Sequence, residues 1–253
     1  MSMGKIMLVI AFFLMGSIYM LNIEKESTSG VLFNNPAESH GVAYYKTTEP
    51  REGAFSFLVP ANWEISGGIT RVEQEPKLYL KLSSPDNKTT VCWLPEMEFI
   101  VPENRSRNIG NTVDEQLKIK SLLTPADFVL TIAVPFAHPH AATIRVTDVK
   151  PITPVWMFSL SGEMNAANRQ AAEVTISYWE NGVFFKEKIT CVIESYTENG
   201  DKKWRNFSTW YVRCDSNSFE AFEPIFSKII SSVEPDKAWT EREIQRRQIV
   251  SPR

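Results

Sequence analysis

An Asn-Gly pair between two long β-rich segments limits the possible folds of this chain more than any other local pattern. Asn181 and Gly182 separate residues 172–180 from residues 183–194, and both segments contain many β-branched and aromatic side chains. A two-residue type I′ turn requires positive φ at both central positions, which Asn-Gly adopts readily. The sequence therefore predicts a long antiparallel hairpin in the C-terminal half.

A second turn, at residues 198–201, leads into a third β-rich segment at residues 204–214 and extends the hairpin to a meander. Ser218 can then cap a helix that ends before Pro235, with Pro224 marking a kink or a later start. The apolar residues of this helix recur at spacings of three and four, which predicts a stripe that packs on the meander. The stripe consists of Phe219, Phe222, Phe226, Ile229, Ile230 and Val233. A further charged helix is predicted over residues 239–248 and is expected to be peripheral.

The N-terminal half contains further strand patterns, bounded by Pro, Gly and Asn. They cover residues 55–59, 63–65, 78–82, 89–94 and 143–149. Gly67-Gly68 is predicted to form a tight turn after the second of them.

Thr124 followed by Pro125 predicts the start of a helix between these strands. Its apolar side chains, Phe128, Ile132 and Phe136, could line one face of the helix. Pro135 must bend or end it.

Meandering strands with helices between runs of strands indicate an α+β fold, with an antiparallel β-sheet flanked by helices. Parallel βαβ alternation is absent from the sequence, which disfavours a doubly wound nucleotide-binding sheet. We predict one domain at residues 52–235, followed by a charged C-terminal helical tail at residues 236–253.

The N-terminal segment predicts export. Lys5 precedes an apolar run at residues 6–21, and polar residues follow, as in a secretory signal. As a helix, these 16 residues span about 24 Å, against a hydrocarbon core of about 30 Å. We therefore expect residues 1–23 to form a signal peptide or a signal anchor, and residues 24–51 to form a polar tether. The N-terminal basic flank places the remainder outside the cytoplasm, either membrane-anchored or secreted.

The net charge and the residue counts limit which partners and which kinds of functional site this chain can have. A net charge of −3 argues against nucleic acid as a partner, because nucleic-acid binding depends on neutralising phosphates. Three histidines leave little material for metal or proton-transfer chemistry. The sequence contains no G-x-S-x-G, Walker, H-E-x-x-H, C-x-x-C or G-x-G-x-x-G motif. We therefore assign no catalytic, cofactor-binding or metal-binding residue, and no cofactor.

Two groups of residues could form a functional site, and each also has a simpler structural interpretation. His138 and His140 would share one face of a strand and could hold a metal with Asp148, whereas the alternative is a solvated loop. A second group could supply a carboxylate pair for acid/base chemistry, with a polar loop as the alternative. Its members are Glu96, Glu98 and Glu103.

The predicted register excludes one disulfide among the three cysteines and leaves two others open. With the second turn centred at residues 199–200, Cys191 faces Ser208 and lies about 20 Å from Cys214, too far for a disulfide. Cys92 could still pair with either of them. The alternative is three buried free thiols that pack as small apolar side chains.

Residues 54–69 contain an aromatic strand that ends at Pro60, followed by an Asn62-Trp63 step, and they resemble the opening hairpin of Mog1/PsbP-like domains. Residues 219–233, after the meander, resemble the final helix of that fold. Over residues 50–240 the chain is similar to secreted or membrane-anchored bacterial proteins of unknown function built in this way. The resemblance implies an α-β-α sandwich and transfers no catalytic residue, because that fold serves as an adaptor, a chaperone-like module or a photosystem accessory protein.

These observations predict a non-catalytic binding or scaffold protein on the outer side of the cytoplasmic membrane. Its partner is expected to be a protein, with membrane contact through the N-terminal segment. One alternative is a chaperone or assembly factor for exported or membrane proteins, which would have an uncovered apolar sheet face. The other is an extracytoplasmic hydrolase, which would have perturbed carboxylates in a deep cleft.

Overall fold

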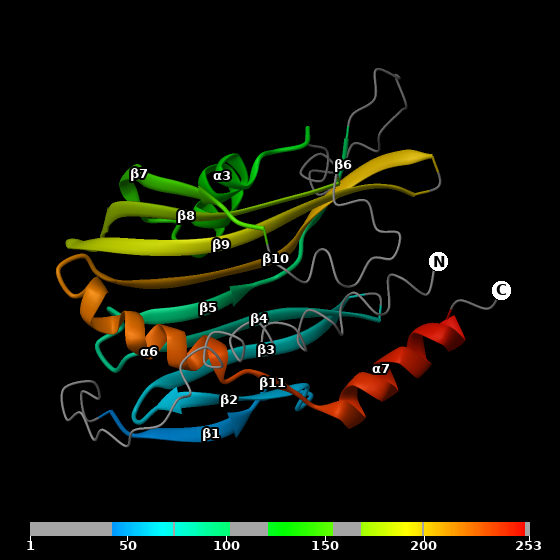
Figure 1. The fold of residues 1–253 in the computed structure, drawn as a ribbon, viewed down its shortest axis with the longest axis horizontal. Helices are drawn as coiled ribbons and strands as arrows, with labels where there is room; N and C mark the ends of the chain where they lie inside the picture. Colours follow the sequence, from blue (N-terminus) through cyan, green and yellow to red (C-terminus); the bar gives the residue numbers. More distant parts are fainter. Residues whose placement is uncertain (1–41, 73, 102–120, 154–167, 199, 251–253) are drawn as a thin grey trace, which may run out of the picture.

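The computed structural model describes residues 42–72, 74–101, 121–153, 168–198 and 200–250, which form two antiparallel sheets and several helices (Figure 1). The α+β class predicted from the sequence is confirmed. The predicted signal peptide or anchor lies outside the described residues. Within the described ranges, no helix combines the length and apolar character needed to cross a membrane.

The larger sheet has eight strands in the order β3-β4-β5-β10-β9-β8-β7, with the short β6 paired to β10. Its strands are β3 (Glu64–Val72), β4 (Glu75–Ser83), β5 (Thr90–Leu94), β6 (Glu98–Ile100), β7 (Ala142–Pro151), β8 (Arg169–Glu180), β9 (Val183–Glu198) and β10 (Asp201–Asp215). The smaller sheet has the order β1-β2-β11 and consists of β1 (Tyr44–Thr48), β2 (Phe55–Pro60) and β11 (Glu234–Pro235). Every pairing in both sheets is antiparallel.

The predicted meander is confirmed as β8, β9 and β10. Asn181 and Gly182 connect β8 to β9 with φ of 51° and 78°, as a type I′ turn requires. The pairing of β8 with β9 is continuous from Arg169 opposite Glu194 at one end to Glu180 opposite Val183 at the other.

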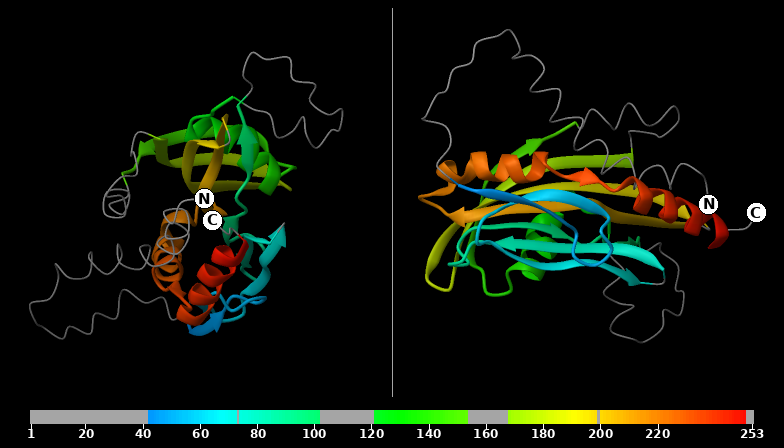
Figure 2. Two further views of the ribbon diagram at one scale, coloured as in Figure 1. Left: turned by 90° about the vertical axis from the view of Figure 1, so that its right-hand side faces the viewer. Right: turned by 90° about the horizontal axis from the view of Figure 1, so that it is seen from below.

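Alternation along the central strands places an apolar core on each face of the larger sheet. On β10, Tyr211 contributes to one core and Val212 to the other. The first, here called the α3-side core, is covered by a helical segment made of α3 (Pro125–Phe128), the π-helical turn η1 (Val129–Ala133) and α4 (Val134–Ala137). The second, the α6-side core, is covered by the smaller sheet, α6 (Phe219–Ser231) and the start of α7 (Lys237–Val250). Figure 2 shows α6 and α7 following one another along the molecule, joined by β11.

The helix predicted to begin at Thr124 does so, and the Thr124 hydroxyl accepts a hydrogen bond from the Asp127 N–H at 3.2 Å. Phe128 and Ile132 both pack in the α3-side core as predicted, but the prediction of a single apolar face was wrong at Phe136. The π-helical turn inserts an extra residue per turn, which rotates the later residues, so Phe128 is buried whereas Phe136 is exposed. Pro135 is accommodated at the start of α4 and does not end the helix.

Gly67 and Gly68 do not form the predicted turn but lie inside β3. Both have positive φ, and the N–H of the next residue, Ile69, donates to the buried Glu49 carboxylate at 2.7 Å. A Cβ on Gly68 would lie 2.5 Å from that carboxylate. Gly68 therefore allows the strand to approach Glu49, a long-range contact that a turn pattern cannot indicate.

The predicted opening hairpin is also divided between two sheets. β2 pairs with β1 and β11, whereas β3 pairs with β4. Part of the predicted tether, Tyr44–Thr48, forms β1, so strand structure begins before residue 52. The domain limits otherwise remain predictions.

A bulge in β10 changes the predicted register of the cysteines. The pairing with β9 shifts between Asn206 and Ser208, so Cys191 faces Thr209 and not Ser208. Cys92, Cys191 and Cys214 are free and buried, which confirms the interpretation as apolar packing residues.

The C-terminal helices follow the predicted stripe, with one correction. Phe219, Phe226 and Ile229 of α6 are buried in the α6-side core. Helix α7 is not wholly peripheral, because Trp239 is buried in the same core and its indole N–H donates to Glu52 at 2.8 Å.

Candidate functional site

The structure separates the three residues considered for a metal site. His138 follows α4 and is buried against the sheet, whereas His140 is exposed in the turn that follows. Asp148 is exposed on β7, where it is opposite Thr175 on the α6 side of the sheet. A turn in which the Ala141 N–H donates to the His138 carbonyl replaces the strand on which the histidines would have shared a face. Within the described ranges, no group of three or more His, Cys, Asp or Glu is arranged to hold a metal ion.

His138 belongs to a buried polar cluster instead, here called the His138 cluster. Its other members come from the adjacent strands β8, β9 and β10, and they are Tyr178, Glu180, Glu187 and Arg213. Glu187 lies between Phe185 and Ile189 on the face of β9 that forms the α3-side core. The cluster is thus a polar island within an apolar core.

Arg213 joins the members of the His138 cluster. Its Nη1 donates to Glu180 Oε2 at 2.5 Å, to Tyr178 Oη at 3.2 Å and to His138 Nδ1 at 2.7 Å. The Tyr178 hydroxyl donates in turn to Glu187 Oε2 at 2.5 Å. Because His138 Nδ1 accepts from Arg213, the ring proton is assigned to Nε2, which lies 3.0 Å from Glu187 without being aligned for a hydrogen bond.

Burial and the neighbouring charges shift the pKa values of Tyr178 and Arg213 in this cluster. Burial and the adjacent Glu187 carboxylate raise the pKa of Tyr178, so its hydroxyl stays protonated. Burial alone would lower the pKa of Arg213, but Tyr178 and Glu180 outweigh it and raise that pKa. The cluster holds its charges as fixed ion pairs and hydrogen bonds, and its geometry fits a structural role.

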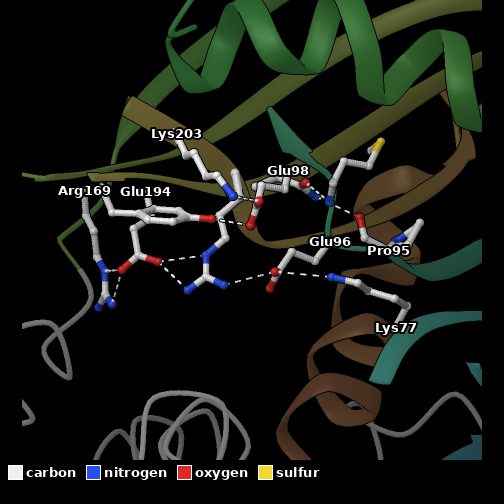
Figure 3. A network of polar contacts seen from close by, with 11 residues as sticks. Lys77, Pro95, Glu96, Glu98, Arg169, Glu194 and Lys203 are labelled. Atoms are coloured by element: carbon white, nitrogen blue, oxygen red, sulfur yellow. Dashed lines mark hydrogen bonds and ion pairs between the residues drawn. The ribbon is translucent and has the colours of Figure 1, made fainter. Parts of the chain in front are cut away.

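The carboxylates predicted as an acid/base pair instead form ion pairs with basic side chains (Figure 3). Glu96 lies 3.1 Å from Arg205 and 3.5 Å from Lys77, while Glu98 accepts from Lys203 at 3.0 Å and from the Tyr196 hydroxyl. Glu103 lies outside the described residues. Glu96 and Glu98 therefore each face cations and do not face one another across a site.

The buried Glu194 is the centre of the same ion-pair network. Its Oε1 accepts a hydrogen bond from Arg169 Nη2 at 2.7 Å, and its Oε2 accepts one from Arg205 Nη2 at 2.6 Å. Burial alone would raise the pKa of Glu194, but the two guanidinium groups outweigh it and hold the pKa below its ordinary value. A general acid needs the opposite shift, so this carboxylate is suited to holding β8, β9 and β10 together.

The cysteines are equally unsuited to nucleophilic chemistry. Burial raises the pKa of both Cys92 and Cys191 to about 12, which keeps the thiols protonated at neutral pH. The thiolate is the reactive form of cysteine.

Exposed apolar side chains gather at one end of the larger sheet. Trp179 and Phe184, which flank the β8–β9 turn, are 49% and 37% exposed, and their ring centroids lie 5.1 Å apart. We call these two residues the aromatic pair. Strand β7, at the edge of the sheet beside them, is exposed along all its ten residues (Figure 1). The aromatic pair is therefore an exposed aromatic patch at the β8–β9 turn.

The sequence contains a signal for the His138 cluster that is not a motif. Glu187 lies between the buried Phe185 and Ile189, and Arg213 lies two residues after the buried Tyr211, so both charges interrupt an apolar strand face. A charged residue at such a position requires a buried partner. The identity of that partner depends on strand pairing, which the alternation alone does not determine.

Comparisons with known proteins give no family. No family model matches the chain, and no curated protein matches it. Among solved structures, the cyanobacterial PsbP (CyanoP) of Synechocystis aligns with 80% of this chain and 100% of its own, at 11% identity and a TM-score of 0.34. LpqN, described as involved in cell envelope biogenesis of Mycobacterium tuberculosis, aligns with 77% of this chain and 86% of its own, at 11% identity and a TM-score of 0.27. Membership of the Mog1/PsbP-like group stays a prediction.

Proposed function

We propose that this protein is a non-catalytic binding or scaffold domain, that it is held on the outer side of the cytoplasmic membrane, and that it binds a protein partner through the aromatic pair. The observation that carries the proposal is the exposure of Trp179 and Phe184 at the end of the β8–β9 hairpin. Large aromatic side chains at such positions are enriched in protein interfaces, because they bury much area at a low cost in side-chain entropy.

The polar chemistry of the domain supports a binding role over a catalytic one. Glu96 and Glu98, the described carboxylates considered for acid/base chemistry, form ion pairs with basic side chains. The buried His138 lies between Arg213 and Glu187. The cores on the two faces of the larger sheet are covered by helices and by the smaller sheet. A chaperone with an uncovered apolar face is therefore less favoured than a domain that binds through a limited patch.

Binding can be tested by crosslinking in intact membranes, followed by purification of the full chain. We expect one stoichiometric partner, and we expect its recovery to fall sharply with Trp179→Ala and with Phe184→Ala. Tyr45→Ala is the matched control, because Tyr45 is also an exposed aromatic residue but lies on β1 in the smaller sheet. Equal loss with all three variants, or no loss with the first two, would contradict the proposed surface.

The location is proposed from the apolar segment at residues 6–21 and the basic Lys5 before it. Protease added to spheroplasts should digest the domain without lysis. Protection until the membrane is broken would place the domain in the cytoplasm. A mass measurement of the mature chain distinguishes a cleaved signal peptide from a retained anchor.

A further inference from the structure

We infer that β7 is a self-complementary edge through which two copies of this chain pair antiparallel, joining their larger sheets into one. This goes beyond binding to another protein, and it uses a different surface from the aromatic pair. Strand β7 ends the strand order, and within the described ranges no strand pairs with its outer side. Along the strand, Ile144, Val146 and Val149 are all at least 36% exposed. An open edge with apolar side chains is a template for a further strand.

The occupant is indicated by the charge pattern of β7. When two copies of the strand Ala142–Pro151 pair antiparallel with all ten residues overlapping, Arg145 of each copy lies opposite Asp148 of the partner copy. In the same register Ile144 lies opposite Val149, also in both directions. Opposite charges and apolar side chains thus meet across a two-fold axis, as an isologous contact requires.

The side chains must also share a face of the sheet, and an irregularity in β7 arranges this. Arg145 is opposite Ser177 and Asp148 is opposite Thr175, so both lie on the α6 side. Residues three apart would point to opposite faces of a regular strand, but the register shifts between Val146 and Asp148. Val149 is opposite Val174 of the α3-side core, and Ile144 reaches that side by alternation from Arg145.

Other registers are disfavoured by the same charges. Sliding the strands so that Val146 meets Val149 of the partner copy would place Arg145 against Lys150, and placing Asp148 on the axis would bring two carboxylates together. Charges on an edge strand usually prevent unwanted pairing. Here the same charges favour the register that pairs Arg145 with Asp148 over these two alternatives, which favours a second copy over an unrelated extended segment.

The test is the mass of the full chain in a mild detergent, measured by sedimentation equilibrium at roughly 10 μM, a concentration suited to micromolar affinity. We expect the wild type to be dimeric, and we expect Arg145→Asp and Asp148→Arg each to weaken the dimer by roughly tenfold or more, because like charges then face each other. The double variant Arg145→Asp/Asp148→Arg should restore the dimer. A monomeric wild type, single variants that stay dimeric, or a double variant that is not restored would each overturn the inference.

Cysteine pairs test the register independently of charge. Ile144→Cys/Val149→Cys should give disulfide-linked dimers under mild oxidation, because the two positions oppose each other between copies. Within one chain they lie about 16 Å apart, too far to bridge. The matched control, Val149→Cys alone, carries one exposed cysteine that lies about 16 Å from its counterpart in the partner copy, and it should crosslink far less. Equal crosslinking of both variants, or crosslinking only to a different protein, would overturn the inference.

Discussion

The His138 cluster provides a direct test of whether buried charge holds this domain together. The perturbation is Arg213→Met, in which an unbranched apolar side chain replaces the aliphatic part of arginine and the guanidinium is removed. The side chains of Arg213 and its ion-pair partner Glu180 are only 9% and 10% exposed. Removing one partner of a buried pair leaves an uncompensated charge and costs about 3–5 kcal/mol. That is a large part of the total stability of a typical domain, which is about 5–15 kcal/mol.

The loss should be measured by urea unfolding of the purified protein at neutral pH, followed by circular dichroism. Lys186→Met is the matched control, because Lys186 forms an ion pair of similar length, 2.6 Å to Glu220, but on the exposed surface. We expect a far smaller change in the midpoint for the control, because solvent screens such a pair.

A second variant separates the uncompensated charge from the loss of packing. Arg213→Met/Glu180→Gln should be more stable than Arg213→Met alone, since it removes the carboxylate that lost its partner. The reasoning from burial is wrong if Arg213→Met lowers the free energy of unfolding no more than Lys186→Met does. It is also wrong if Glu180→Gln lowers the stability of the Arg213→Met variant as much as it lowers that of the wild type.

Four further predictions concern the fold and its pH dependence. Phe226→Ala should cost about 3–5 kcal/mol, because the ring is buried in the α6-side core, and an unchanged urea midpoint would remove α6 from that core. Trp239→Ala should cost a similar amount, although α7 is highly charged, and a negligible change would restore the expectation of a peripheral tail. Gly182→Val should cost about 1–3 kcal/mol, because φ is 78° there, and thermal unfolding measures it. The pKa of Glu194 is lowered in the folded state from its ordinary value of 4.5, so its contribution is complete at neutral pH and is lost as the pH falls through the folded pKa. The stability gap between wild type and Glu194→Gln should therefore shrink in acid, and a gap independent of pH would contradict the ion-pair assignment.

The local patterns in the sequence were sufficient for the meander and for the helix starts. Asn181-Gly182 determines its own backbone conformation, and Thr124 caps the residues that follow it directly. The stripe of α6 likewise follows from periodicity, because helix geometry alone places Phe219 and Phe226 on one side. Such features depend on residues within a few positions of each other, so the sequence by itself determines them.

The tertiary structure decided what depends on distant segments. Gly67-Gly68 has the composition of a turn, but Glu49 from another element holds its backbone within a strand. Trp239 lies in a charged helix, yet it is buried because β11 directs α7 onto the α6-side core. The spacing of His138 and His140 predicts that they share one face of a strand. The folded chain instead surrounds His138 with residues of three strands. Strand pairing brings these groups together, and the free energy that selects it comes from burial over the whole domain, which no short pattern contains.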